Sequence, residues 1–170
     1  MEQTLHISEA QLKLRDAGIQ MKLAIANIGD PDVFRSCLNS FISGCRSVMD
    51  VASVESEAND QLAAWCKAET KRIGAIPVVR FFWKQRELTI HRQAVKPQSL
   101  SAPISNMVVN GEKRPGKGTM SAWFFDNPGR YLPGDNGNVP RLCEQYFLIV
   151  KKFVHTWLSE KTRFENVVAS

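Results

Sequence analysis

Arg86 and His91, with four residues between them in the stretch FFWKQRELTIHRQ, are the pair whose types and spacing could do chemistry. An arginine can stabilise negative charge on a phosphate group. A histidine titrates near neutral pH and can therefore give or take a proton during a reaction. The pair fits a site that binds a phosphate group and moves a proton.

Glu87 precedes His91 by four positions, so the two side chains are neighbours on one flank of a helix. A carboxylate beside an imidazole favours the charged ring and can fix its orientation. A structural interpretation stays open beside this one. In it, Arg86 pairs with an internal carboxylate such as Asp50 or Glu69, while Glu87 and His91 form a solvent-facing pair.

The helix that carries Arg86 is predicted to bury one apolar face. At about 100° per residue, Val79, Phe82, Trp83 and Ile90 surround Arg86 on that face. This pattern predicts that Arg86 lies in the middle of the buried face. A guanidinium there must be paired or must line a cleft, because a buried charge without a partner costs several kcal/mol.

Five segments have helical periodicity. Asp30 followed by Pro31 predicts an N-cap and a first helical turn, and the apolar stripe that follows runs to Met49. The other predicted helices cover residues 8–28, 56–73, 77–95 and 139–161.

Residues 97–140 hold six of the eight prolines and six of the ten glycines, which excludes helix for most of this segment. Two β-prone runs, ISNMVV and TMSAWFF, flank the sequence NGEKRPGKG and predict a hairpin with a long tip. We therefore expect an all-α, up-and-down bundle of about five helices in a single domain, residues 1–170. A small β-hairpin or irregular insertion precedes the last helix.

The tip of this hairpin nearly matches a phosphate-binding P-loop. Gly118 stands where that motif needs a hydroxyl side chain, and no buried strand leads into a helix around it. Lys113, Arg114 and Lys117 are instead expected in a solvated turn, or as contacts to the phosphates of an RNA partner.

Composition limits the class of protein. With 44% apolar and 23% charged residues, the chain can bury a core, and the net charge of +5 permits a polyanionic partner. The start lacks the pattern of a signal peptide and no run is long enough to span a bilayer, so a cytoplasmic protein is expected. The four cysteines have no metal-ligand spacing and are expected as reduced core thiols; no metal or cofactor is expected.

The segment Arg86–His91 resembles the R-x4-6-H motif of the HEPN superfamily, and FISGCRSVMDV is similar to a segment of some HEPN-like bacterial proteins. The resemblance covers about residues 8–95 and the last helix. It implies a metal-independent endoribonuclease that acts as a homodimer, often with an antitoxin or another partner protein. It makes Arg86 the phosphate-stabilising residue and His91 the general acid or base, while Glu87 stands where the family commonly has Asn, Asp or His.

Two other hypotheses remain from the sequence. The chain could be a non-catalytic HEPN-like module that binds RNA, a nucleotide or a protein. It could also be a structural protein that assembles through an apolar face, because its last helices are rich in aromatic residues. The wheel places Phe81 and Leu88 opposite the main apolar stripe, as such a face requires.

Overall fold

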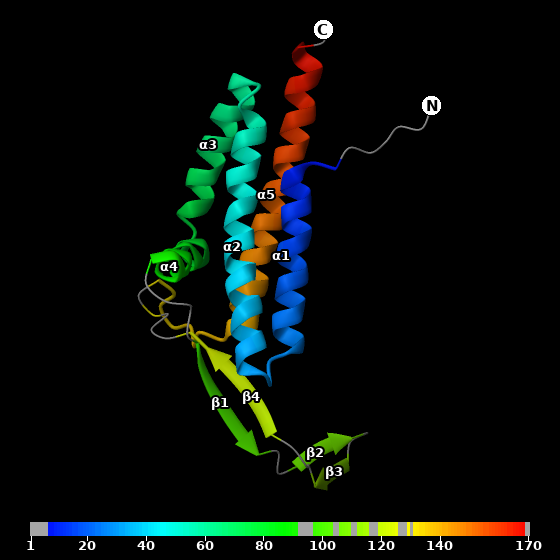
Figure 1. The fold of residues 1–170 in the computed structure, drawn as a ribbon, viewed down its shortest axis with the longest axis vertical. Helices are drawn as coiled ribbons and strands as arrows, with labels where there is room; N and C mark the ends of the chain where they lie inside the picture. The colour runs from blue at the N-terminus through cyan, green and yellow to red at the C-terminus, as the bar shows by residue number, and fades with distance from the viewer. Residues whose placement is uncertain are drawn as a thin grey trace, which may run out of the picture.

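The computed structural model describes residues 7–91, 97–103, 106–109, 112–115, 119–125, 129 and 131–168 (Figure 1). For residues 88–91, 103, 106–109, 113–115 and 167–168 it describes the backbone but not the side chains. The elements in chain order are α1 (Glu9–Ala26), α2 (Pro31–Ser56), α3 (Asp60–Gly74), α4 (Pro77–His91), β1 (Gln98–Pro103), β2 (Asn106–Val109), β3 (Glu112–Pro115), β4 (Thr119–Phe124) and α5 (Val139–Val168).

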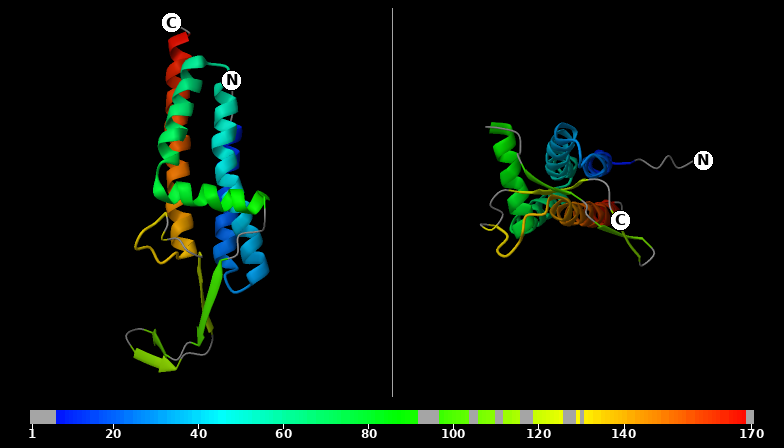
Figure 2. Two further views of the ribbon diagram at one scale, coloured as in Figure 1. Left: turned by 90° about the vertical axis from the view of Figure 1, so that its left-hand side faces the viewer. Right: turned by 90° about the horizontal axis from the view of Figure 1, so that it is seen from below.

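The helices form a bundle, as the sequence predicts. Helices α1, α2 and α5 run side by side, α3 packs beside them, and α4 crosses the bundle at a steep angle (Figures 1 and 2). The strands project from the end of the bundle near α4 as a narrow arm. None of the described helices is long and apolar enough to cross a membrane.

Local signals set most helix ends. The Asp30 side chain accepts hydrogen bonds from the backbone N–H groups of Asp32 and Val33, which confirms the predicted cap of α2. Helix α3 begins at Asp60 and not near residue 56, because the Asn59 side chain caps it by accepting from two backbone N–H groups. Helix α5 continues past the predicted end at residue 161, to Val168.

Aromatic side chains fill the core where α2, α4 and α5 meet. Phe41 contacts Phe82 and Tyr146 edge to face, and the rings of Phe82 and Tyr146 stack with centroids 4.6 Å apart. Phe81 is also buried, packed against Phe125 and Tyr131 from the segment that follows β4. The prediction that Phe81 faces away from the core is therefore wrong, because α4 is covered on two sides.

The strands pair differently from the predicted hairpin. Strand β4 pairs antiparallel with β1, from Gln98 opposite Phe124 to Pro103 opposite Thr119, and β2 pairs with β3 as a second ribbon. The base of β4 is anchored to the bundle, since the indole N–H of Trp123 donates to the carbonyl of Ile28 at 2.7 Å. A P-loop needs a helix directly after its glycines. Here the segment 111–118 is followed by strand β4, so this condition is not met.

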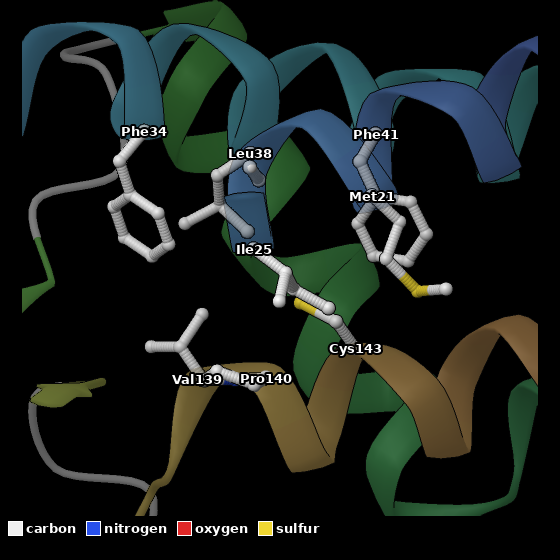
Figure 3. A pocket seen from close by; sticks show the side chains of 9 residues that line it. Met21, Ile25, Phe34, Leu38, Phe41, Val139, Pro140 and Cys143 are labelled. Carbon is white, nitrogen blue, oxygen red and sulfur yellow. The ribbon is translucent and has the colours of Figure 1, made fainter. Parts of the chain in front are cut away.

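One internal cavity lies among α1, α2 and the start of α5 (Figure 3). Its lining is apolar and includes Met21, Leu38 and Cys143, and its volume is about 10 Å³. A space of this size without polar partners holds no ordered ligand. The four cysteines are free thiols, as predicted, and Cys45, Cys66 and Cys143 are buried in the core, whereas Cys37 is only half-buried.

Candidate functional site

A polar cleft lies where α4 crosses α2, and Arg46, Trp83, Arg86 and Glu87 line it. We call it the α2–α4 cleft. Its volume is about 180 Å³, and it is open to solvent on one side. Two guanidinium groups from different helices thus share one small space, which is unfavourable unless a negative group lies between or beside them.

Arg86 lies at the edge of the buried face of α4 and not at its middle. Val78, Val79, Phe81 and Phe82 are buried, whereas Arg86 is only half-buried. The predicted position was wrong because the helix packs on the side of Phe82, where the core aromatic residues meet.

No carboxylate in the described part of the chain pairs with Arg86. Its Nε atom is buried and has no hydrogen-bond partner there. The two carboxylates considered from the sequence are engaged elsewhere: Asp50 pairs with Arg46 at 3.2 Å and Glu69 with Arg72 at 2.6 Å. The interpretation of Arg86 as half of an internal ion pair with Asp50 or Glu69 is therefore wrong.

Arg46 is held in place by two contacts. Its guanidinium stacks over the Trp83 ring at 4.1 Å from the ring centroid, and its Nε atom lies 3.2 Å from the Asp50 carboxylate. The side chain keeps 26% of its surface exposed. Arg46 is therefore oriented in the cleft before any ligand arrives.

Tyr146, from α5, adds a polar group at the buried end of this cluster. Its side chain is fully buried, and burial raises the pKa of its hydroxyl, as does the nearby Cys45 thiol. The neighbouring Trp83 side chain and the positive charges of Arg46 and Arg86 partly offset that rise in pKa. Trp83 is close to Tyr146, yet neither its indole N–H nor the hydroxyl completes a hydrogen bond of normal geometry.

Gly74, the last residue of α3, leaves room for Trp83. A Cβ atom at this position would lie 2.5 Å and 2.7 Å from two atoms of the Trp83 ring. Gly74→Ala is expected to displace Trp83, disrupt its stacking with Arg46 and cost about 1–3 kcal/mol of stability. Urea unfolding measures this cost, and Gly29→Ala is the matched control because nothing lies within 4 Å of a Cβ there. Equal urea midpoints for the two variants would contradict the expected clash.

The other predicted site residues are placed as follows. Glu87 is exposed and accepts a hydrogen bond from the Lys84 ammonium group at 2.8 Å. His91 is the last residue of α4, but its side chain lies outside the described part of the structure. Lys113 and Arg114 belong to β3, again without described side chains, and Lys117 lies outside the described residues. The predicted contact between Glu87 and His91 therefore lies outside the described side chains.

Arg46, Trp83 and Tyr146 are the residues that sequence reasoning missed as parts of this site. Trp83 and Tyr146 fall on apolar helical stripes, where an aromatic residue is normally core. Arg46 stands within the segment FISGCRSVMDV, so the two segments that carry the family resemblance contribute one arginine each to the same cleft. Within the described residues, no three His, Cys, Asp or Glu side chains are grouped as metal ligands.

A scan of protein-family models found none that matches this chain, and searches of curated proteins and of solved structures found no significant match. The fold and the cleft define the class of molecule: a five-helix bundle with a β-arm and a cationic cleft where two helices cross.

Proposed function

We propose that this chain is a HEPN-like protein that acts on RNA, as a dimeric endoribonuclease that needs no metal ion. The observation that supports the proposal most is the half-buried Arg86 side chain beside Arg46 in the α2–α4 cleft, whose Nε atom has no hydrogen-bond partner among the described residues. Arg46 already pairs with Asp50, and a phosphate of the RNA backbone would supply negative charge to Arg86.

The proposed reaction uses the 2′-hydroxyl of the RNA as the nucleophile. The 2′-oxygen attacks the adjacent phosphorus, the bond to the 5′-oxygen breaks, and the products are a 2′,3′-cyclic phosphate and a 5′-hydroxyl. His91 takes the proton from the 2′-hydroxyl or gives one to the leaving 5′-oxygen. Arg86 and Arg46 stabilise the charge that develops on the phosphate oxygens. In the HEPN arrangement the second proton-transfer group comes from the other copy of the chain, and a dimer is therefore part of the proposal.

A second candidate is binding of RNA without cleavage. Glu87 favours this candidate. It follows Arg86 directly, at the position where the family commonly has Asn, Asp or His, and it forms an ion pair with Lys84. Binding needs the arginines of the cleft but not the proton transfer by His91. Lys113 and Arg114 of β3, and Lys117, which follows them in the sequence, would add phosphate contacts in either case.

The test is incubation of the purified protein with mixed RNA in the presence of EDTA. The parent is expected to cleave RNA, His91→Ala is expected to lose cleavage, and His155→Ala is the matched control because His155 lies exposed on α5. Absence of cleavage by the parent, or equal cleavage by His91→Ala, would reject the nuclease. Retarded migration of uncut RNA would then support the second candidate. Light scattering that finds a monomer at every concentration would reject the dimeric mechanism.

A further inference from the structure

Three buried polar atoms have no hydrogen-bond partner of normal geometry in the described protein. Two of them, the Trp83 indole nitrogen and the Arg86 Nε atom, belong to residues that line the α2–α4 cleft, and the third is the hydroxyl oxygen of Tyr146, a fully buried residue beside Trp83. A buried donor left without an acceptor costs about 1–3 kcal/mol, so these three need an explanation. Arg46, which also lies in the cleft, adds a second positive charge.

The chemistry of these groups restricts the ligand. The indole and guanidinium groups only donate hydrogen bonds, and the tyrosine hydroxyl, whose pKa is raised by burial, keeps its proton at neutral pH. The nearby carboxylates of Asp50 and Glu87 already pair with Arg46 and Lys84. A ligand that satisfies this cluster must carry several acceptor oxygens and negative charge, as an oxoanion does.

The shape of the cleft argues against a nucleobase at this position. One face of the Trp83 ring is covered by the Arg46 guanidinium at 4.1 Å, and its edge packs against Gly74. The face under Arg46 is therefore not open for a base to stack on as it does in single-stranded RNA sites. The volume of about 180 Å³ accepts a phosphate group.

We propose that the α2–α4 cleft is a phosphate site for free phosphate or a terminal phosphate monoester, with Tyr146 and Trp83 as ligands beside Arg46 and Arg86. A monoester has three terminal oxygens, whereas an internal phosphodiester has two and a chain leaving on both sides. The inference rests on the proposed function, in which the same cleft holds the phosphate at which RNA is cut. After cleavage, water can attack the phosphorus of the 2′,3′-cyclic phosphate and break its bond to the 2′-oxygen, which leaves an RNA strand with a 3′-phosphate; that strand then stays bound and competes with uncut RNA.

Isothermal titration with inorganic phosphate at constant ionic strength tests the site without any RNA. Tyr146→Phe and Arg46→Met are each expected to weaken phosphate binding about tenfold or more, since each removes a hydrogen bond to a charged group. Tyr131→Phe, which alters the only other tyrosine of the chain, and Arg35→Met, on the same helix as Arg46, are the matched controls and should bind as the parent does. Equal binding by parent and Tyr146→Phe would overturn the inference.

Thermal melting separates a ligand role of Tyr146 from a structural one. Because its hydroxyl has no partner in the described protein, Tyr146→Phe should melt no lower than the parent without phosphate and should gain less than the parent when phosphate is added. A lower melting temperature without phosphate would mean that the hydroxyl already has a structural partner, such as a bound water, and would overturn the inference.

Short RNAs with a 3′-phosphate or a 3′-hydroxyl distinguish the two sources of the ligand. Tighter binding of the phosphorylated RNA than of inorganic phosphate supports an RNA end, and equal binding supports free phosphate.

The phosphate site and the nuclease activity can be rejected independently of each other. RNA cleavage that depends on His91, with phosphate binding that Tyr146→Phe leaves unchanged, rejects only the phosphate site. Phosphate binding that depends on Tyr146, without RNA cleavage, rejects only the nuclease.

Discussion

Replacing Arg86 by Met should lower the rate of RNA cleavage by roughly 100- to 1,000-fold, the usual effect of losing one group that stabilises charge in a transition state. The fold should tolerate this change, because Met keeps most of the volume of the apolar stem. In the described structure no carboxylate pairs with Arg86, so the substitution does not deprive a buried carboxylate of its partner. Initial cleavage rates and urea midpoints of the two proteins measure the two effects separately.

Arg35→Met is the matched control for this substitution. Arg35 also lies over a tryptophan, 5.8 Å from the Trp123 ring centroid, and faces a carboxylate, Asp32, at 3.8 Å. It does not line the α2–α4 cleft. If both variants lose cleavage equally, the loss reflects general charge and the role assigned to Arg86 is wrong. If Arg86→Met unfolds at a much lower urea concentration than the parent, Arg86 serves the fold first.

Replacing Trp157 by Ala should destabilise the protein by about 3–5 kcal/mol, the range for removing a large buried aromatic side chain. Trp157 is fully buried on α5, and its indole N–H donates to the Ser56 hydroxyl at 2.9 Å. Ser56 in turn donates to the carbonyl of Ala52 at 2.6 Å. The substitution thus removes both a large apolar surface and the link between α5 and the end of α2. Urea unfolding at one pH measures the loss.

Two comparison variants separate the contribution of the buried apolar surface from that of the indole hydrogen bond. Trp157→Phe keeps most of the apolar surface but not the indole N–H, and should cost about 1–2 kcal/mol. Leu148→Ala, on the same helix but with 62% of its side chain exposed, should change stability by less than about 0.5 kcal/mol. A loss for Trp157→Ala as small as that for Leu148→Ala would show that Trp157 is not part of the core.

Burial of these aromatic residues bears on the idea of assembly through an apolar face. Phe81, Phe82, Phe153 and Trp157 are all buried within one chain, and Trp83 is half-buried beneath Arg46. The aromatic content that suggested an exposed face is thus used by the core. The hypothesis of a structural protein therefore loses the observation that supported it. The only remaining argument for a dimer is the proposed reaction.

Local sequence determined the helices because their signals act over a few residues. The period of the apolar residues predicts five helices and their order, and Asp30 with Pro31 predicts where α2 begins. Proline and glycine between residues 97 and 140 exclude helix there, since proline removes a backbone donor and glycine is costly in helix. Reduced cysteines followed in the same way from their spacing and their apolar surroundings.

Strand pairing was decided by tertiary structure. The polar sequence of β1 resembles a loop more than a strand, and it becomes the partner of β4 because Trp123 and Phe125 fix the base of β4 against the bundle. Only Asn110 and Gly111 separate β2 from β3, and this dipeptide is a signal for a short hairpin that could have predicted the second ribbon.

The candidate site was also decided by the packing of helices distant in sequence. A helical wheel gives the angle between Arg86 and its neighbours on α4, but not the direction from which α2 and α5 approach. That direction places Phe82 at the centre of the contact, leaves Arg86 at its edge, and brings Arg46 and Tyr146 close to Trp83. Sequence spacing therefore singled out Arg86, while its neighbours in the cleft depend on the crossing of three helices, which no short-range pattern encodes.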